Sequence, residues 1–300
     1  MSIPDPPPIQ DLAIQRDCGL YRLTTFRIGG RADVYRPATI KATERTLRHF
    51  AKEGIPYRVL GRGSNLLVEE GPHPPLLSLE RLTAVDMERL DDSRFRVSVG
   101  AGCTLPFLLA WSARAGLTGL EPFAGIPASM GGAVAMNAGT RVRSIFDITE
   151  SVLLTTSEGS AWVPAGDMKH GYRETGLPAG SVVSGIRILL TSGDREGILA
   201  AIKKVMERRV STQPIGRPSA GCIFKNPPGG SAGWFIDQAG LKGTRVGGAE
   251  VSRRHGNFIV NQDGCTFADV MNLMELVHRK VHDEYGIQLE QEVEVWRAVS

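Results

Sequence analysis

The sequence has few cysteines, almost no excess charge and no long apolar run, and each shortage excludes a class of protein. Its four cysteines (Cys18, Cys103, Cys222 and Cys265) lie far apart with no Cys-x-x-Cys pair, which excludes a zinc ribbon or a thioredoxin-type motif. In a chain of 300 residues they indicate reduced thiols rather than disulfides. The net charge of +3 is far from that of a dedicated nucleic-acid-binding protein. No apolar run reaches the roughly 18 residues that a membrane helix needs.

The N-terminal segment lacks the basic start and apolar stretch of a signal peptide, so we expect a cytoplasmic protein. The length suggests about two domains, and strand-like and helix-like patterns alternate throughout, which predicts an α+β fold. We predict a flexible, proline-rich lead-in over residues 1–20, a first domain over 21–193 that is split near residue 77, and a second domain over 194–300. A return of the last strand to the first domain stays open.

Local signals place the clearest helices. Thr266 with Asp269 three residues later forms a capping-box pattern before an apolar stripe that ends at Gly286. Thr104 opens a second predicted helix, and Asp194 caps a third.

Glycine is the residue in excess, at 35 of 300, and it concentrates in residues 61–66 and 125–139. Neither segment carries a common nucleotide motif. Leu66 stands where a Rossmann loop has its third glycine, no Gly-Lys dipeptide supports a Walker A loop, and Pro127 occupies the first glycine position of a nucleophile elbow around Ser129.

Each of the two glycine-rich loops follows a strand-like or helical segment. Their main-chain amides can converge on an anion, because no Cβ blocks its approach. Such a pair suits a dinucleotide whose pyrophosphate is held by the main chain. The alternative is a pair of tight turns without a ligand.

Eight segments occur in a characteristic order: residues 25–32 (TFRIGGRA), 61–67 (GRGSNLL), 125–127 (GIP), 136–139 (MNAG), 221–227 (GCIFKNP), 240–243 (GLKG), 255–258 (HGNF) and 289–293 (LEQEV). Together they resemble the UDP-N-acetylenolpyruvoylglucosamine reductase family in its shorter form, from about residue 23 to residue 296.

The resemblance implies non-covalent FAD in a fold like that of the vanillyl-alcohol oxidases, followed by a C-terminal substrate domain. It also implies that NADPH reduces the flavin and that the enolpyruvyl ether of UDP-N-acetylglucosamine then receives the hydride, giving UDP-N-acetylmuramate for peptidoglycan. A protein acid protonates the neighbouring carbon.

The resemblance assigns catalytic roles to three residues. Arg173 stabilises the charge that develops on the substrate carboxylate, for which a guanidinium fork is well suited. Glu292 hydrogen-bonds the same developing acid, although the alternation alone favours a solvated residue of a charged edge strand. Cys222 stands where many members have a proton-donating serine, and a thiol, with an ordinary pKa of about 8.5, is the stronger acid.

The remaining expected site residues fall into two sets. The cofactor set is Gly61, Arg62, Gly63, Ser64, Asn65, Leu66, Gly125, Ile126, Pro127, Ala128, Ser129, Gly131, Gly132, Asn137, Ala138 and Gly139. The substrate set is Tyr172, Arg217, Lys225, Asn226, Lys242 and His255. Ala128 departs from a glycine that is common in the family, which would strain the loop if that position needs a positive φ.

Two other readings stay open: an FAD-dependent sugar or lactone oxidase of the same fold, and a non-catalytic protein that binds a UDP-sugar. His278 and His282 have the i, i+4 spacing of a helical metal pair, but no third ligand is signalled, so we expect no metal site. We expect no nucleic-acid partner and no membrane insertion.

Overall fold

The computed structural model describes residues 8–299, and its internal contacts divide the chain into two compact units. The first unit holds the N-terminal segment up to Arg16 together with Asp33–Arg62 and Pro74–Met206. The second unit holds Asp17–Ala32, Gly63–His73 and the chain from Glu207 onward. The division of binding roles between residues 21–193 and 194–300 stays a prediction.

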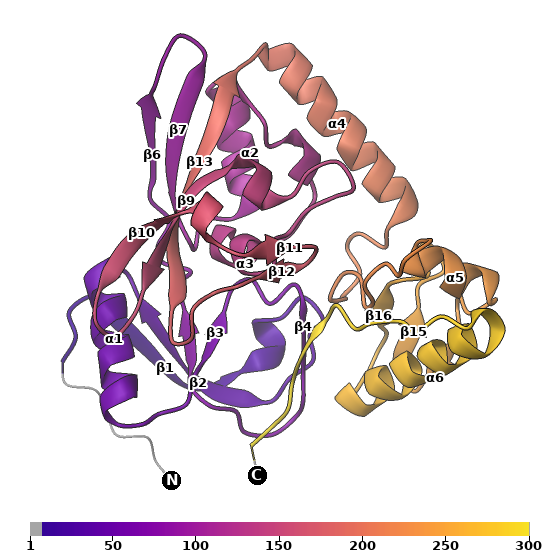
Figure 1. Ribbon diagram of the computed structural model, residues 1–300. Coiled ribbons are helices and arrows are strands. Elements are labelled where there is room, and N and C mark those ends of the chain that lie inside the picture. Colours follow the sequence, from indigo (N-terminus) through magenta and orange to yellow (C-terminus); the bar gives the residue numbers. More distant parts are fainter. Residues whose placement is uncertain (1–7, 300) are drawn as a thin grey trace. The chain divides into compact units, whose positions relative to one another are not determined.

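The first sheet of the first unit is mostly parallel (Figure 1). Its strands run in the order β1 (Leu12–Gly19), β2 (Arg31–Pro37), β5 (Leu76–Ser78) and β3 (Arg58–Leu60), with α1 (Ile40–Lys52) joining β2 to β3. Both β2 and β3 pair in parallel with β5. The prediction of a flexible lead-in up to residue 20 is wrong for β1, because Leu12 and Ile14 alternate along a strand and pack against the core. Residues 1–7 of that prediction lie outside the described part of the chain.

The second sheet of this unit is antiparallel. Its strands run in the order β10 (Ser160–Pro164), β9 (Thr149–Thr155), β13 (Val182–Ser192), β7 (Arg94–Gly100) and β6 (Val85–Arg89), with β8 (Leu117–Thr118) paired to β13. Two helices, α2 (Leu105–Arg114) and α3 (Met130–Ala135), and a small hairpin of β11 (His170–Gly171) and β12 (Glu174–Thr175) complete it. The 3-10 turns are η2 (Glu121–Phe123), η3 (Ile145–Ile148) and η4 (Ala165–Asp167). The central core cluster packs between these elements around residues such as Phe123, Met130 and Ile186.

The second unit has its own core. Its elements are η1 (Leu20–Arg22), the parallel pair β4 (Leu66–Val68) and β17 (Glu294–Trp296), the meander β14 (Arg245–Val246), β15 (Ala249–Val251) and β16 (Ile259–Asn261), and the helices α5 (Ala232–Gln238) and α6 (Phe267–Tyr285). The last point at which the chain passes from the first unit to the second falls inside α4 (Arg195–Thr212). The apolar face of α6 packs on the second core through Val270, Leu273 and Val277.

The capping predictions are confirmed. Thr266 and Asp269 form a reciprocal capping box at the start of α6, and Gly286 ends that helix with a φ of +67°. Thr104 caps α2, and the carboxylate of Asp194 accepts from the Gly197 amide at 2.7 Å in the first turn of α4. The α+β class is confirmed as well. Within residues 8–299, no helix has both the length and the apolarity to cross a bilayer.

Candidate active site

A pocket of about 520 Å³ in the first unit brings the two glycine segments together. Gly61 and Arg62, which follow β3, line one part of it, and Ser129, Gly131 and Gly132 at the start of α3 line another. Its size lies within the range of small-molecule and cofactor sites. Two segments that are more than 60 residues apart in the sequence therefore contribute to one cavity.

The glycines of this pocket allow close approach of neighbouring residues, but they differ in their amides. The Gly131 amide donates to the Ala101 carbonyl oxygen at 2.9 Å, and the Gly132 amide donates to the Ser129 Oγ at 3.4 Å. A Cβ on Gly61 would lie 3.0 Å from the Ser129 Oγ, and one on Gly131 would lie 2.9 Å from the Ala101 Cβ. For the Gly61 and Arg62 amides, residues 8–299 provide no hydrogen-bond acceptor. Main-chain amides without protein acceptors, beside positions that carry no Cβ, fit an anionic cofactor group such as a pyrophosphate.

Part of the lining was not anticipated from the sequence. The turn after β7 contributes Gly102, Cys103 and Thr104, and Phe107 of α2 is half exposed beside them. A Cβ on Gly102 would lie 2.3 Å from the Leu79 carbonyl oxygen, so this glycine is required by a close chain crossing. The sequence signal that could have identified this part of the pocket is the pair of glycines at and just after the end of β7, Gly100 and Gly102. Burial raises the pKa of Cys103 to about 11, so its thiol keeps its proton at neutral pH.

The other expected cofactor residues of residues 125–139 do not line the pocket. Gly125 adopts a φ of +82°, and Asn137, which is buried, adopts +38°. Ala128 is not among the residues with positive φ, so an alanine is accommodated there without strain. The same segment contains α3, which begins at Met130 with Ser129 as its N-cap. The expected residues Ile126, Pro127, Ala138 and Gly139 lie before and after this helix.

Arg173 lies in the turn of the β11–β12 hairpin, also in the first unit. Its φ of +59° is a left-handed conformation that costs energy for a residue with a Cβ. Its Nη2 donates to the Gly139 carbonyl oxygen at 3.2 Å, and its guanidinium lies 5.3 Å from the ring centroid of the exposed Tyr172. The guanidinium is therefore anchored at one nitrogen to the end of the second glycine segment.

In the second unit the segments that carry Cys222 and Glu292 are neighbours. The Glu292 amide donates to the Ile223 carbonyl oxygen at 2.8 Å, directly after Cys222. The Asn65 Nδ2 donates to the Glu292 carbonyl oxygen at 3.1 Å. Gly221, with a φ of +79°, turns the chain into this segment. The backbones of Asn65, Cys222 and Glu292 thus lie together, although they are separated by more than 60 residues along the chain.

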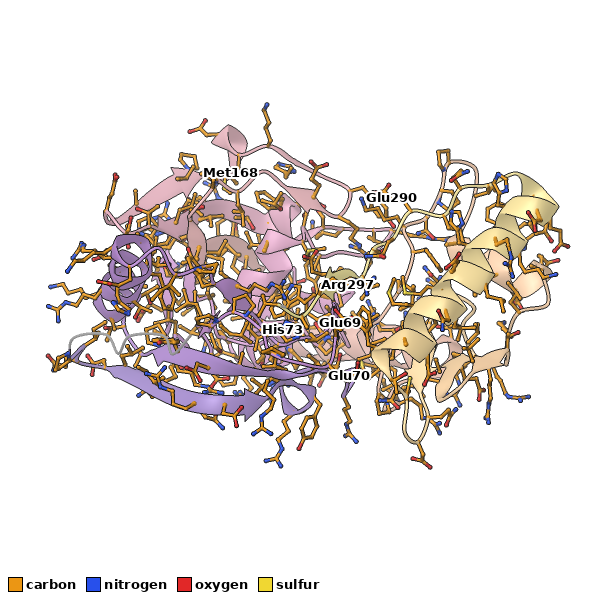
Figure 2. All side chains as sticks on the ribbon, turned by 90° about the horizontal axis from the view of Figure 1, so that it is seen from below. Glu69, Glu70, His73, Met168, Glu290 and Arg297 are labelled. Carbon is orange, nitrogen blue, oxygen red and sulfur yellow. The ribbon has the colours of Figure 1, made fainter. Side chains whose placement is uncertain are left out.

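Glu292 precedes β17 and is half buried. Its neighbour Glu290, which is labelled in Figure 2, is exposed. Glu290 accepts a hydrogen bond from Lys225 at 2.5 Å. Strand β17 is held at its far end by Glu69 of the β4 segment. The Glu69 carboxylate accepts from the Ala298 amide at 2.9 Å and lies 3.6 Å from Arg297. The register of the strand that follows Glu292 is fixed by these contacts.

The three basic residues of the expected substrate set are candidates to contact the UDP diphosphate, and each already has a partner in the second unit. These partners are Glu290 for Lys225, Asp237 for Lys242 at 2.6 Å, and Gln262 for Arg217 at 2.5 Å. Because a lysine has three N–H donors and an arginine has five, each side chain keeps further donors for a phosphate beside this bond.

Asn226 and His255 serve the local main chain. The Asn226 Oδ1 accepts from the Ala232 amide at 3.0 Å, and the His255 Nδ1 accepts from the Asn257 amide at 3.2 Å. Burial lowers the pKa of His255, and the charge of Lys242 lowers it further. A neutral imidazole is needed for the hydrogen bond that Nδ1 accepts.

The rest of the first glycine loop belongs to the second unit. Gly63 adopts a φ of +61°, and a Cβ there would lie 2.2 Å from the Leu23 carbonyl oxygen. Ser64 is half buried, and Leu66 begins β4. The loop of residues 61–66 thus changes unit between Arg62 and Gly63.

Comparison with protein families finds two matches that divide the chain. Residues 32–163 match the model of an FAD-binding domain, and residues 213–296 match that of the C-terminal domain of UDP-N-acetylenolpyruvoylglucosamine reductase. The expected combination of an FAD-binding fold with a C-terminal α+β domain is confirmed.

Individual proteins match over nearly the whole chain. The UDP-N-acetylenolpyruvoylglucosamine reductase of Heliobacterium modesticaldum is 42% identical over 279 residues, which are 91% of this chain and 88% of that protein. The reductase of Syntrophobacter fumaroxidans is 38% identical over 292 residues, which are 96% of this chain and 85% of that protein. The crystal structure of the Thermus caldophilus reductase superposes with a TM-score of 0.82 at 40% identity and covers 95% of this chain and 99% of its own.

Proposed function

The chain belongs to the UDP-N-acetylenolpyruvoylglucosamine reductase family and is an FAD-containing oxidoreductase, and from this premise we propose that it uses NADPH to reduce UDP-N-acetyl-3-O-(1-carboxyvinyl)-glucosamine to UDP-N-acetylmuramate. The reaction serves peptidoglycan precursor synthesis in the cytoplasm. The observation that carries the proposal is the pocket formed by both glycine segments within the FAD-binding domain.

The residues expected to hold FAD through its pyrophosphate are Gly61 and Arg62, together with Ser129, Gly131 and Gly132 of the same pocket. The bound flavin supplies the hydride that the enolpyruvyl double bond receives. Arg173 directs a guanidinium toward the substrate carboxylate, where negative charge develops as the hydride is added. This interaction is stronger in the transition state than in the ground state, so it accelerates the reaction.

Cys222 donates its proton to the carbon next to the carboxylate. Glu292 hydrogen-bonds the substrate carboxylate as negative charge develops on it. A thiol can fill the place of a serine because it is the stronger acid and still holds its proton at neutral pH. The support for this pair is the hydrogen bond that joins their segments, from the Glu292 amide to the Ile223 carbonyl oxygen.

The test is NADPH consumption by the purified protein under anaerobic conditions, with and without the enolpyruvyl UDP-sugar. Consumption that requires the sugar nucleotide and yields UDP-N-acetylmuramate supports the proposal. Reduced flavin that reacts with oxygen but not with the UDP-sugar would indicate a sugar or lactone oxidase instead. Tight UDP-sugar binding with neither flavin nor turnover would indicate a binding protein.

A further inference from the structure

Asn137 lies near the end of the second glycine segment, and both its side-chain nitrogen and its side-chain oxygen hydrogen-bond to the main chain. The side chain belongs to a residue only 6% exposed. Its Nδ2 donates to the Gly171 carbonyl oxygen at 2.7 Å, and its Oδ1 accepts from the Phe146 amide at 3.4 Å. Gly171 is the last residue of β11, two positions before Arg173. Asn137 therefore contacts the base of the turn that presents Arg173.

The β11–β12 hairpin depends on such contacts from outside. Each of its strands has two residues, which is too short for a hairpin to be stable by itself. The Thr175 Oγ1 donates to the Val134 carbonyl oxygen at 2.7 Å, and the His170 ring stacks on Phe146 with centroids 4.3 Å apart. The hairpin is thus fastened to α3 and to the residues that follow it.

We propose that Asn137 is a positioning residue that fixes the Arg173 turn against the segment whose start lines the cofactor pocket. The proposal rests on the proposed function, because it takes Arg173 as the residue that stabilises the substrate carboxylate. It gives Asn137 a role other than direct contact with FAD. The donor to Gly171 is buried, and its loss removes a hydrogen bond that ties the base of the turn to the second glycine segment.

Substitutions of Asn137 can separate two explanations for an asparagine at this position: its tolerance of the backbone conformation and the hydrogen bonds of its side chain. Asparagine tolerates the φ of +38° better than most residues and also provides a donor and an acceptor. Asn137→Gly keeps the tolerance of this φ but removes the amide. Asn137→Asp keeps the shape and the acceptor, but it replaces the donor with an oxygen that faces the Gly171 carbonyl oxygen. If only the backbone conformation matters, the glycine variant behaves like the wild type.

The experiment measures the two half-reactions separately under anaerobic conditions by flavin absorbance. Flavin content and the rate of flavin reduction by NADPH are expected to stay within about two-fold of the wild type in both variants, since neither measures the placement of Arg173. Reoxidation of the reduced flavin by the enolpyruvyl UDP-sugar is expected to slow by about 10- to 100-fold, the effect of misplacing a catalytic group by about 1 Å.

Thr140→Ala is the matched control. Thr140 directly follows the second glycine segment, and within residues 8–299 the hydrogen bonds of its hydroxyl stay within residues 140–143. Its removal takes away neither the Asn137 amide nor the Gly139 carbonyl oxygen that Arg173 contacts, so both half-reactions are expected to stay within about two-fold of the wild type.

A double variant tests whether Asn137 acts through Arg173. Arg173→Lys with Asn137→Gly is expected to reoxidise no more than about three-fold more slowly than Arg173→Lys alone, because the effects of residues that act as a unit are not additive. Full additivity overturns the proposal, as does wild-type reoxidation by Asn137→Gly. Loss of flavin in both variants also overturns it and assigns Asn137 to cofactor binding.

Failure of the proposed function gives a different result: the UDP-sugar does not reoxidise the reduced flavin of the wild-type protein. Hydrogen exchange of a peptide spanning residues 169–176 then decides the positioning role. Faster exchange in the two Asn137 variants but not in Thr140→Ala supports it, and unchanged exchange overturns it.

Discussion

Gly63 provides the sharpest test of why the first glycine loop needs its glycines. Replacement by alanine places a Cβ at a φ of +61°, 2.2 Å from the Leu23 carbonyl oxygen and 2.8 Å from the Thr24 Cα. The left-handed conformation costs about 1–2 kcal/mol for a residue with a Cβ. The overlap with main-chain atoms forces a backbone shift that costs about a further 1–3 kcal/mol. The shift also disturbs the 3.0 Å hydrogen bond from the Thr25 amide to the Gly63 carbonyl oxygen.

Gly264→Ala is the matched control for this substitution. Gly264 belongs to the same unit and has a φ of +71°, but a Cβ there would meet nothing within 4 Å. Thermal unfolding followed by circular dichroism should therefore show a loss of about 1–2 kcal/mol for Gly264→Ala, and about 2–5 kcal/mol for Gly63→Ala. At about 2–4 °C per kcal/mol for a chain of this order of size, the two variants should be separated by several degrees. Equal losses would refute the steric argument and leave the φ as the whole cause.

Three further predictions concern single side chains. Cys222→Ser should keep turnover within about 10-fold of the wild type, whereas Cys222→Ala should lose more than about 100-fold in steady-state assays; equal activity of the alanine variant would contradict a proton-donor role. The lowered pKa of His255 means that the unfolded chain takes up a proton first as pH falls, so stability should decrease below about pH 6.5. His255→Asn should flatten this part of a denaturation–pH curve, and an unchanged slope would count against it. The lowered pKa of Asp269, caused by the amides of Thr266 and Gly248, stabilises the fold above about pH 4, and this contribution is lost as pH falls through the native pKa. Asp269→Asn should therefore lower stability by about 0.5–1 kcal/mol at pH 7 and by less near pH 3 in urea titrations, whereas the same loss at both values would exclude a charge-dependent cap.

The helices with complete local signals were predictable from the sequence, and the pairing of distant segments was not. The helix α6 follows from Thr266, Asp269 and Gly286, because a capping box and a C-terminal glycine act within one turn of the residues they stabilise. The parallel pairing of β4 with β17 joins residues 66–68 to 294–296. Two three-residue strands carry no pattern that identifies the partner, so the assignment of residues 63–73 to the second unit could not be predicted.

The candidate site shows the same limit at shorter range. The segment of residues 125–139 was predicted as a loop, but it contains the six-residue helix α3. Gly131 and Gly132 lower its intrinsic helix propensity, and the helix is stable because Met130 and Ala133 are fully buried in the core. Ser129 as N-cap was the one local signal. The part of the pocket formed by residues 102–104 was missed because Gly102 is explained by a contact with Leu79, which the sequence does not show.

The asparagines of the two glycine segments do the same chemical task in their separate units. Asn65 donates to the carbonyl oxygen of Glu292, and Asn137 donates to that of Gly171, two residues before Arg173. A side-chain amide can hold a main-chain carbonyl oxygen at a place where neither a strand nor a helix continues. In the proposed function, the glycines would let the main chain approach the cofactor, and the asparagine that follows would fix a catalytic residue from the same segment. A change in either segment should therefore alter cofactor binding and catalytic geometry together unless, as at Asn137, the side chain is replaced without disturbing the main chain.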